Sequence, residues 1–222
     1  MSIAQNIETI TAFLKNTSCH LIAVSKTYPD SSIMEAYNAG QRSFGENKVQ
    51  ELVSKYESLP KDIAWHLIGH LQSNKVKYIA PFISLIHAVD SLKLLKEINK
   101  EAGKNQRVIQ VLLQIYIAEE DTKFGLSFEE AEELCSSEEL KQMTQIKIIG
   151  FMGMATNTDN SEQIHFEFRS LKTFFEKCKS AYAFSNLDLR ELSMGMSNDY
   201  KIALEEGSTM IRVGSSIFGK RN

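Results

Sequence analysis

A lysine stands at the end of a short apolar run near the start of the chain, in the segment Leu21-Ile22-Ala23-Val24-Ser25-Lys26-Thr27-Tyr28-Pro29. A run of about five residues rich in Val and Ile is typical of a buried strand. Pro29 ends that strand and presets a turn, so we expect Lys26 at the carboxyl end, where parallel α/β folds bind ligands. A desolvated lysine amine can condense with an aldehyde to form a Schiff base. Taken alone, a strand-end lysine is more often a solvated charge, so the interpretation depends on other residues.

Two turns near the end of the chain could hold a phosphate group. They are Ser193-Met194-Gly195-Met196-Ser197 and Val213-Gly214-Ser215-Ser216, each directly after an expected strand. Their glycines allow close backbone approach, their serines supply hydroxyls, and a helix start offers N–H groups to an anion. Each turn taken alone is weak evidence, because Gly-Ser after a strand is usually only a turn and Ser197 could be only a helix cap; Asp199 in the same region also mildly disfavours an anion. Together, after strands seven and eight, they match a recurring phosphate site of α/β barrels.

Arg212 lies within the last expected strand. Period-two alternation puts Met210, Arg212 and Gly214 on one face of that strand, and Ile211 and Val213 on the other. If Ile211 and Val213 pack against helices, Arg212 points into the mouth of the barrel. A buried guanidinium needs an acceptor. That acceptor is either an atom of a ligand or a structural ion-pair partner such as Glu46.

A reactive amine, a phosphate cradle and an inward arginine together suggest pyridoxal 5'-phosphate (PLP). Lys26 would bind the aldehyde, the glycine and serine turns would hold the phosphate, and Arg212 would face the ring nitrogen. A guanidinium cannot give that nitrogen a full proton, so the ring would remain a poor electron sink. This disfavours demanding carbanion chemistry.

The elements that must position these residues alternate along the chain. Expected strands begin at about Leu21 and then cover 41–44, 64–68, 84–89, 107–117, 146–149, 189–194 and 210–213. Expected helices cover 2–15, 30–39, 48–58, 75–80, 91–102, 127–135, 161–180 and 198–206. Connections are short and no linker interrupts them. This pattern predicts one domain over 1–222, a closed (β/α)8 TIM-type barrel with an extra N-terminal helix rather than an open doubly wound sheet.

Composition narrows the class of protein. The chain has 222 residues and a net charge of -3 from 25 basic and 28 acidic side chains. It therefore lacks the excess of basic residues that would indicate binding to nucleic acid or to an anionic membrane. Cys19, Cys135 and Cys178 are odd in number and form no CxxC pair, which fits a reducing compartment. Residues 1–15 resemble neither a signal peptide nor a membrane span, so we expect a cytoplasmic protein. His66 and His70 fall on a strand and a loop, so we expect no metal site.

Six segments carry a resemblance to a known family, in family order over nearly the whole chain. They are Ala23-Val24-Ser25-Lys26-Thr27, Phe44-Gly45-Glu46-Asn47, Trp65-His66-Leu67-Ile68-Gly69, Leu71-Gln72-Ser73-Asn74-Lys75, Leu192-Ser193-Met194-Gly195-Met196-Ser197 and Arg212-Val213-Gly214-Ser215. The chain resembles the pyridoxal phosphate homeostasis proteins, fold type III PLP proteins similar to the barrel domain of alanine racemases. It departs from the family pattern at His70, Tyr116, Phe151 and Gly153.

The resemblance implies a PLP site and a role. Lys26 would hold PLP as a Schiff base and Arg212 would lie near the pyridine nitrogen. Asn47 would lie beside the cofactor and Met152 would line the same mouth. The implied phosphate contacts are Ser193, Met196, Ser197, Gly214 and Ser215. The implied function is intracellular PLP (vitamin B6) homeostasis, carried out by a monomeric carrier without an established catalytic reaction. PLP-dependent apo-enzymes would receive the cofactor from it.

A second hypothesis is a PLP-dependent racemase-like enzyme with weak activity. The chain ends just after the eighth strand, which leaves no room for the second domain that racemases of similar fold use. Lys26 is one obvious base, but proton transfer on two sides of an amino-acid carbon also needs an acid. Tyr116 or His70 could serve as that acid, so both hypotheses stay open.

Overall fold

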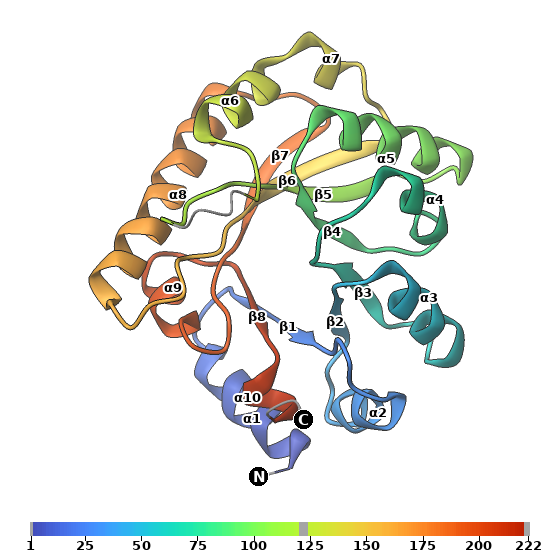
Figure 1. Ribbon diagram of the computed structural model, residues 1–222, viewed down its shortest axis with the longest axis vertical. Helices are drawn as coiled ribbons and strands as arrows, with labels where there is room; N and C mark the ends of the chain where they lie inside the picture. Colours follow the sequence, from blue (N-terminus) through green and yellow to red (C-terminus); the bar gives the residue numbers. More distant parts are fainter. Residues whose placement is uncertain (1, 120–123, 220–222) are drawn as a thin grey trace.

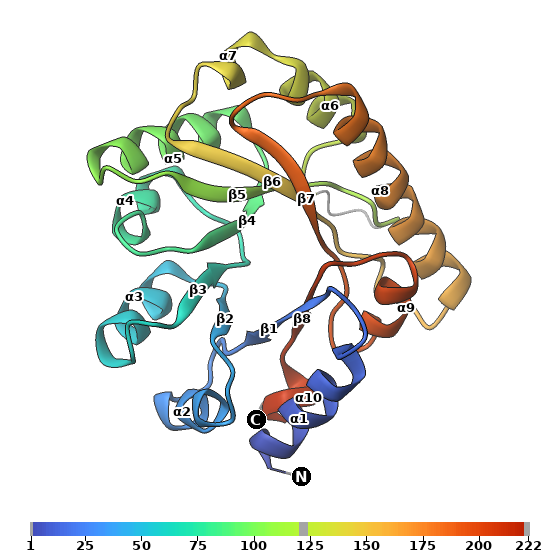
Figure 2. The ribbon, with the colours of Figure 1, turned by 180° about the vertical axis from the view of Figure 1, so that it is seen from behind.

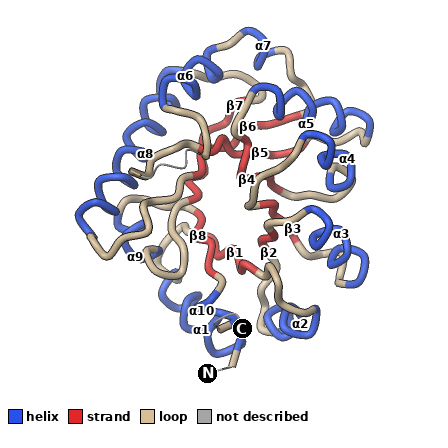
Figure 3. Tube along the Cα trace, viewed as in Figure 1, coloured by secondary structure: helices blue, strands red, loops and turns tan. Residues whose placement is uncertain are grey.

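The computed structural model describes residues 2–119 and 124–219, and its centre is a closed barrel of parallel strands (Figures 1 and 3). The strands pair in sequence order, and β1 closes the barrel on β8 through the register Ile22 to Arg212. Their bounds are β1 His20–Val24, β2 Ser43–Glu46, β3 Ala64–Leu67, β4 Leu85–Val89, β5 Ile109–Gln114, β6 Ile146–Met152, β7 Leu187–Ser193 and β8 Met210–Val213. The predicted TIM-type fold is confirmed.

Helices surround the barrel on its outside (Figures 1 and 2). Their bounds are α1 Ile3–Leu14, α2 Asp30–Asn38, α3 Val49–Ser58, α4 Val76–Ile79, α5 Leu92–Lys104, α6 Phe128–Ser136, α7 Glu138–Lys141, α8 Ser161–Ala181, α9 Tyr200–Glu205 and α10 Ser215–Phe218, with a 3-10 turn at Ser73–Lys75. In the described part of the chain, no helix combines the length and the apolar character that a bilayer crossing requires.

The predicted extra helix α1 packs beside α10 and closes the ring next to β8. Ser2 and Gln5 form a reciprocal capping box that satisfies N–H groups at its start. The Asn6 side chain donates a 2.8 Å hydrogen bond to the Ile217 carbonyl, which ties α1 to α10. Because α10 is only four residues long, α1 supplies most of the helical cover that a longer helix after β8 would give.

The core has two layers, as alternation predicts for a filled barrel. A small cluster that includes Met152 and Met210 lies inside the barrel. A larger cluster lies between the strands and the helices, and it includes Ile211 and Val213. Strand β8 therefore turns its even-numbered side chains inward, and the predicted inward orientation of Arg212 is confirmed.

The structure differs from the expected elements at several boundaries. β6 continues through Met152, and Glu46 is the last residue of β2 rather than part of a loop. The short helices α7 and α10 were not predicted, because four residues carry too little periodicity to be recognised. α5 continues through Gly103 to Lys104, two residues beyond its expected end, and Asn105 supplies the C-cap.

Candidate functional site

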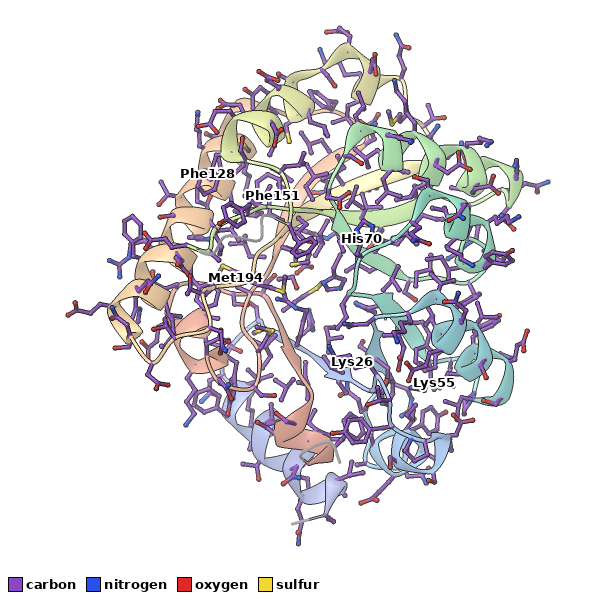
Figure 4. The ribbon with its side chains drawn as sticks, viewed as in Figure 1. Lys26, Lys55, His70, Phe128, Phe151 and Met194 are labelled. Atoms are coloured by element: carbon purple, nitrogen blue, oxygen red, sulfur yellow. The ribbon has the colours of Figure 1, made fainter. Side chains whose placement is uncertain are left out.

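A pocket of about 810 Å³ opens at the carboxyl ends of the strands. Its wall combines the ends of β1 and β8 with the loops that follow β2, β6 and β7. Seven of the nine residues predicted from the sequence line it together, namely Lys26, Asn47, Met196, Ser197, Arg212, Gly214 and Ser215. Figure 4 shows Lys26 at the inner side of the barrel, whereas Lys55 lies toward α3. The structure thus gathers residues that are up to 189 positions apart in the chain.

The other two predicted residues lie deeper in the barrel. Met152 belongs to the interior cluster, and Ser193 is fully buried at the end of β7; neither is among the described residues that line the pocket. Met152 of β6 and Ser193 of β7 are partners in the strand register. This pairing was not predicted, because β6 extends further than its apolar pattern indicated. Met154, two residues beyond Met152, lines the pocket instead.

The residues on either side of Lys26 are held by a buried ionic network. Lys55 of α3 donates a 2.8 Å hydrogen bond to the Ser25 carbonyl and a 2.6 Å bond to Glu51. Glu51 in turn accepts the Thr27 N–H at 2.5 Å. Thr27 has φ of 69°, a left-handed conformation that is costly for a residue with a branched side chain. The Glu51 contact holds this turn, so the position of Lys26 is fixed through both of its neighbours.

Glu46 completes this network beneath Lys26. Its carboxylate is fully buried, accepts 2.6 Å and 2.8 Å hydrogen bonds from Ser25 and Lys55, and leaves Oε2 without a partner in the described residues. Burial raises the pKa of Glu46, and Lys55 offsets part of that rise. Burial also acts to raise the pKa of Glu51, but its bonds to Lys55 and Thr27 outweigh it and the net pKa is lowered. The open alternative of a Glu46–Arg212 ion pair is therefore wrong, since Glu46 pairs with Lys55.

Arg212 is held by neutral oxygen atoms at the base of the pocket. Its guanidinium donates to the Ser193 carbonyl at 2.7 Å, the Ser193 hydroxyl at 2.5 Å and the Gly153 carbonyl at 3.1 Å. Burial lowers the pKa of Arg212 to about 10, and nearby Asp199 opposes that shift. The side chain therefore stays charged at neutral pH and carries its positive charge into the pocket.

A chain of buried polar side chains continues from Arg212 into the barrel. His87 Nδ1 lies 2.9 Å from the Ser193 hydroxyl, and His87 Nε2 lies 2.9 Å from His66 Nδ1. Burial lowers the pKa of His66 to about 4 and that of His87 well below its ordinary value. Both rings are therefore neutral at pH 7, and each can donate through one nitrogen and accept through the other. Because Arg212 can only donate, the Ser193 oxygen accepts from it, which leaves the hydroxyl proton for His87 Nδ1.

We expect this histidine pair to make the fold sensitive to acid. The unfolded chain protonates both rings below about pH 6.5, whereas the folded chain excludes those protons until a lower pH, so stability is lost as pH falls. Each ring contributes a loss of about 2 kcal/mol between pH 7 and pH 5. Urea unfolding should be measured for His87→Gln and for wild type at pH 7 and pH 5. The loss of stability between the two pH values should be about 2 kcal/mol smaller in His87→Gln than in wild type.

The exposed His70 provides the matched control, since His70→Gln removes a histidine whose ring faces Asp90 rather than the buried pair. It should leave the difference between pH 7 and pH 5 nearly unchanged, because exposed ion pairs contribute little to stability. An equal pH-dependent loss in His87→Gln and wild type would contradict the assignment of His87 as a buried neutral ring.

The loop after β7 folds tightly against α9 through Gly195. Its φ is +91°, and a Cβ there would lie 2.6 Å from Ala203 Cβ and 2.9 Å from Tyr200 Cα. Two backbone N–H groups of the phosphate turns contact nearby side chains. The Met196 N–H donates to Asp199 Oδ1 at 2.5 Å, and the Gly214 N–H donates to the Ser197 hydroxyl at 3.2 Å.

Gly195→Ala is expected to destabilise the protein by about 1–3 kcal/mol, because alanine meets both a left-handed backbone and two close atoms. Thermal unfolding measures this loss. Gly103→Ala is the matched control. Gly103 lies in helix α5, and the atom nearest an added Cβ is 3.5 Å away on flexible Gln145. Alanine there should be neutral or stabilising by up to about 1 kcal/mol. Equal effects of the two substitutions would contradict this account of the loop.

Several residues of the site escaped sequence reasoning. Lys55 and Glu51 are one helical turn apart, a spacing that usually marks a solvated pair. The packing of α3 on β2 and β3 buries Lys55 and partly covers Glu51. His87 sits inside an apolar strand, and that was a usable signal because a buried histidine needs a polar partner.

The residues of the pocket fit an aldehyde cofactor that carries a phosphate. Lys26 and Arg212 come from neighbouring strands and line one pocket, which puts an amine and a fixed positive charge on the same ligand. At the phosphate turn after β8, a Cβ on Gly214 would lie 3.3 Å from the Val24 carbonyl. Glycine thus allows this turn to lie against the end of β1 without crowding, while Ser197 and Ser215 supply hydroxyls beside it.

The comparison with protein families agrees with this fold. Residues 1–222 match the family described as alanine racemase, N-terminal domain, so the chain belongs to that family. An alanine racemase from Bartonella henselae shares the fold with a TM-score of 0.71 at 16% identity, and the chain spans 60% of that protein.

Relatives of similar length define the family more narrowly. The pyridoxal phosphate homeostasis protein of Aquifex aeolicus is 41% identical over 90% of this chain and 86% of its own length. That of Escherichia coli K12 is 37% identical over 91% and 86%. The structure of PipY from Synechococcus elongatus with PLP bound is 36% identical, with a TM-score of 0.88 over 98% of this chain and 100% of that chain. The chain belongs to the pyridoxal phosphate homeostasis proteins.

Proposed function

We propose that this protein binds PLP through a Schiff base on Lys26 and takes part in intracellular PLP homeostasis. The observation that carries the proposal is the convergence of Lys26, Arg212 and the two phosphate turns on one pocket. Relatives that match 90% and 91% of this chain are named for PLP homeostasis, and the PipY structure contains PLP.

Each proposed contact uses a group suited to it. Lys26 would bind the aldehyde, and its position is fixed by the network around Ser25 and Thr27. Arg212 would face the ring nitrogen, with its orientation set by Ser193 and Gly153. The phosphate would contact Met196, Ser197, Gly214 and Ser215, and Asn47 would lie beside the ring. When bound, the cofactor would supply an aldehyde for the Schiff base and a pyridine ring that, beside a guanidinium, stabilises negative charge on an attached amino acid only weakly.

The proposal assigns a carrier rather than an enzyme. Among the described residues that line the pocket, the titratable side chains are Lys26, Asp159, Asp199 and Arg212. His70, a candidate acid in the sequence, is exposed and faces Asp90 at 3.3 Å instead of lining the pocket. Lys26 is the one amine base in this set. Of the two carboxyl groups, Asp199 is held by the Met196 N–H and Asp159 is exposed, so we assign neither as the second proton donor that racemisation needs. We further propose a cytoplasmic monomer that gives PLP to apo-enzymes.

Amino-acid racemisation and cofactor transfer test the proposed function together. Purified protein loaded with PLP should activate a PLP-requiring apo-enzyme while it racemises alanine at well below about 1 per second, the low end of typical enzymes. Protein carrying Lys26→Ala is the control for transfer. Racemisation above that rate would establish the racemase-like alternative instead.

A further inference from the structure

An acidic side chain that the proposed function does not use lies directly after the first phosphate turn of the pocket. Asp199 is 8% exposed, lines the pocket and accepts the Met196 N–H at 2.5 Å. That N–H is one of the groups that would hold the cofactor's phosphate. A carboxylate therefore occupies the place where an incoming anion needs a donor.

Two anions cannot share this donor at low cost. A carboxylate and a phosphate oxygen on one N–H would lie within a few ångströms of each other, where like charges repel strongly in a partly buried site. Burial already raises the pKa of Asp199, and the Met196 N–H and Arg212 counter that rise. The other titratable lining groups are Lys26 at the end of β1 and Asp159 in the loop before α8.

We propose that Asp199 is a resident competitor for the cofactor's phosphate, whose carboxylate must leave the Met196 N–H before that group can hold PLP. This inference rests on the proposed PLP site and adds a means of release. The competing carboxylate returns when the phosphate leaves, so it weakens the grip on the phosphate and favours handing the cofactor on. A carrier needs such a weakened grip, whereas an enzyme that retains its cofactor does not.

A purely structural role for Asp199 makes the opposite prediction. If the carboxylate only braces the turn, its loss should weaken phosphate binding because the turn loosens. Asp199→Asn separates the two roles, since the amide keeps an oxygen that can accept the Met196 N–H but removes the charge. Asp159→Asn is the matched control, because it removes one charge from an exposed residue of the same pocket.

The test measures the affinity of each full-length variant for PLP and for inorganic phosphate. Asp199→Asn should bind both about fivefold or more tightly than wild type, whereas Asp159→Asn should change by less than about twofold, because its exposed charge is screened. Equal or weaker phosphate binding by Asp199→Asn would overturn the proposal. Inorganic phosphate needs no lysine, so this arm is independent of whether PLP attaches to Lys26.

A measurement on the wild-type chain covers the case in which Asp199→Asn does not fold. The carboxyl carbon resonance of Asp199 and the amide resonance of Met196 are followed by NMR as PLP, or inorganic phosphate, is added to saturation. Both should shift together, because one loses the N–H and the other exchanges acceptors. An Asp199 resonance that stays in place at saturation would overturn the proposal.

Discussion

Lys26→Ala is expected to abolish the yellow colour of protein treated with PLP and to weaken PLP binding at least about 100-fold, or about 2.7 kcal/mol. The covalent bond to the aldehyde is lost, so only the contacts from Arg212 and the phosphate turns remain. Absorbance spectra and equilibrium dialysis measure the two effects. The fold should be preserved, because Lys26 lies at the rim and is only partly buried.

Two further variants make this result specific. Lys26→Arg keeps the positive charge but cannot condense with an aldehyde, so it should also remain colourless. Lys48→Ala removes an exposed lysine directly after Asn47 and should keep both colour and affinity. Colour and affinity retained by Lys26→Ala would refute the assignment of Lys26 as the attachment site.

Lys55→Met is expected to have the largest effect on stability, a loss of about 3–5 kcal/mol. The substitution removes the cation that pairs with buried Glu46 at 2.8 Å and supports Glu51 at 2.6 Å. An unpaired buried charge is costly, whereas removal of both partners is much less so. Chemical denaturation of Lys55→Met and of Lys55→Met/Glu46→Gln should therefore show that the second change restores part of the loss.

The same pair predicts a pH dependence with a definite sign. A buried carboxyl with a raised pKa holds a proton in the folded state that the unfolded chain has already lost, so stability falls as pH rises above its ordinary value. Because the loss of Lys55 raises the pKa of Glu46 further, the deficit of Lys55→Met should be larger at pH 8 than at pH 5. A deficit below about 1 kcal/mol at both pH values would contradict the buried network.

The ionic network also explains why a lysine at this turn can act as a fixed anchor. Thr27 adopts a left-handed conformation, and Glu51 and Lys55 hold the backbone on both sides of Lys26. The network is thus a support for the site rather than part of it. Its loss should therefore reduce PLP affinity even in variants that remain folded.

The sequence predicts the barrel and the centre of its pocket well, because both depend on simple periodicity. Alternation alone orients Arg212 inward, and the Pro29 turn places Lys26 at a strand end. The depth of a side chain in the barrel is harder to predict. It depends on register, and irregular pairing of β6 with its neighbours places Met152 and Ser193 below the pocket wall. The support from Lys55, Glu51 and His87 comes from tertiary packing, which local patterns do not contain.

The central claim is that one lysine holds the cofactor, and reduction with borohydride tests it most directly. Borohydride converts the bond between PLP and an amine into a stable link, so peptide mapping by mass spectrometry then identifies the modified residue. We predict a single stoichiometric label in the peptide that contains Lys26. A label on another lysine, or none in protein that has bound PLP, would contradict the account.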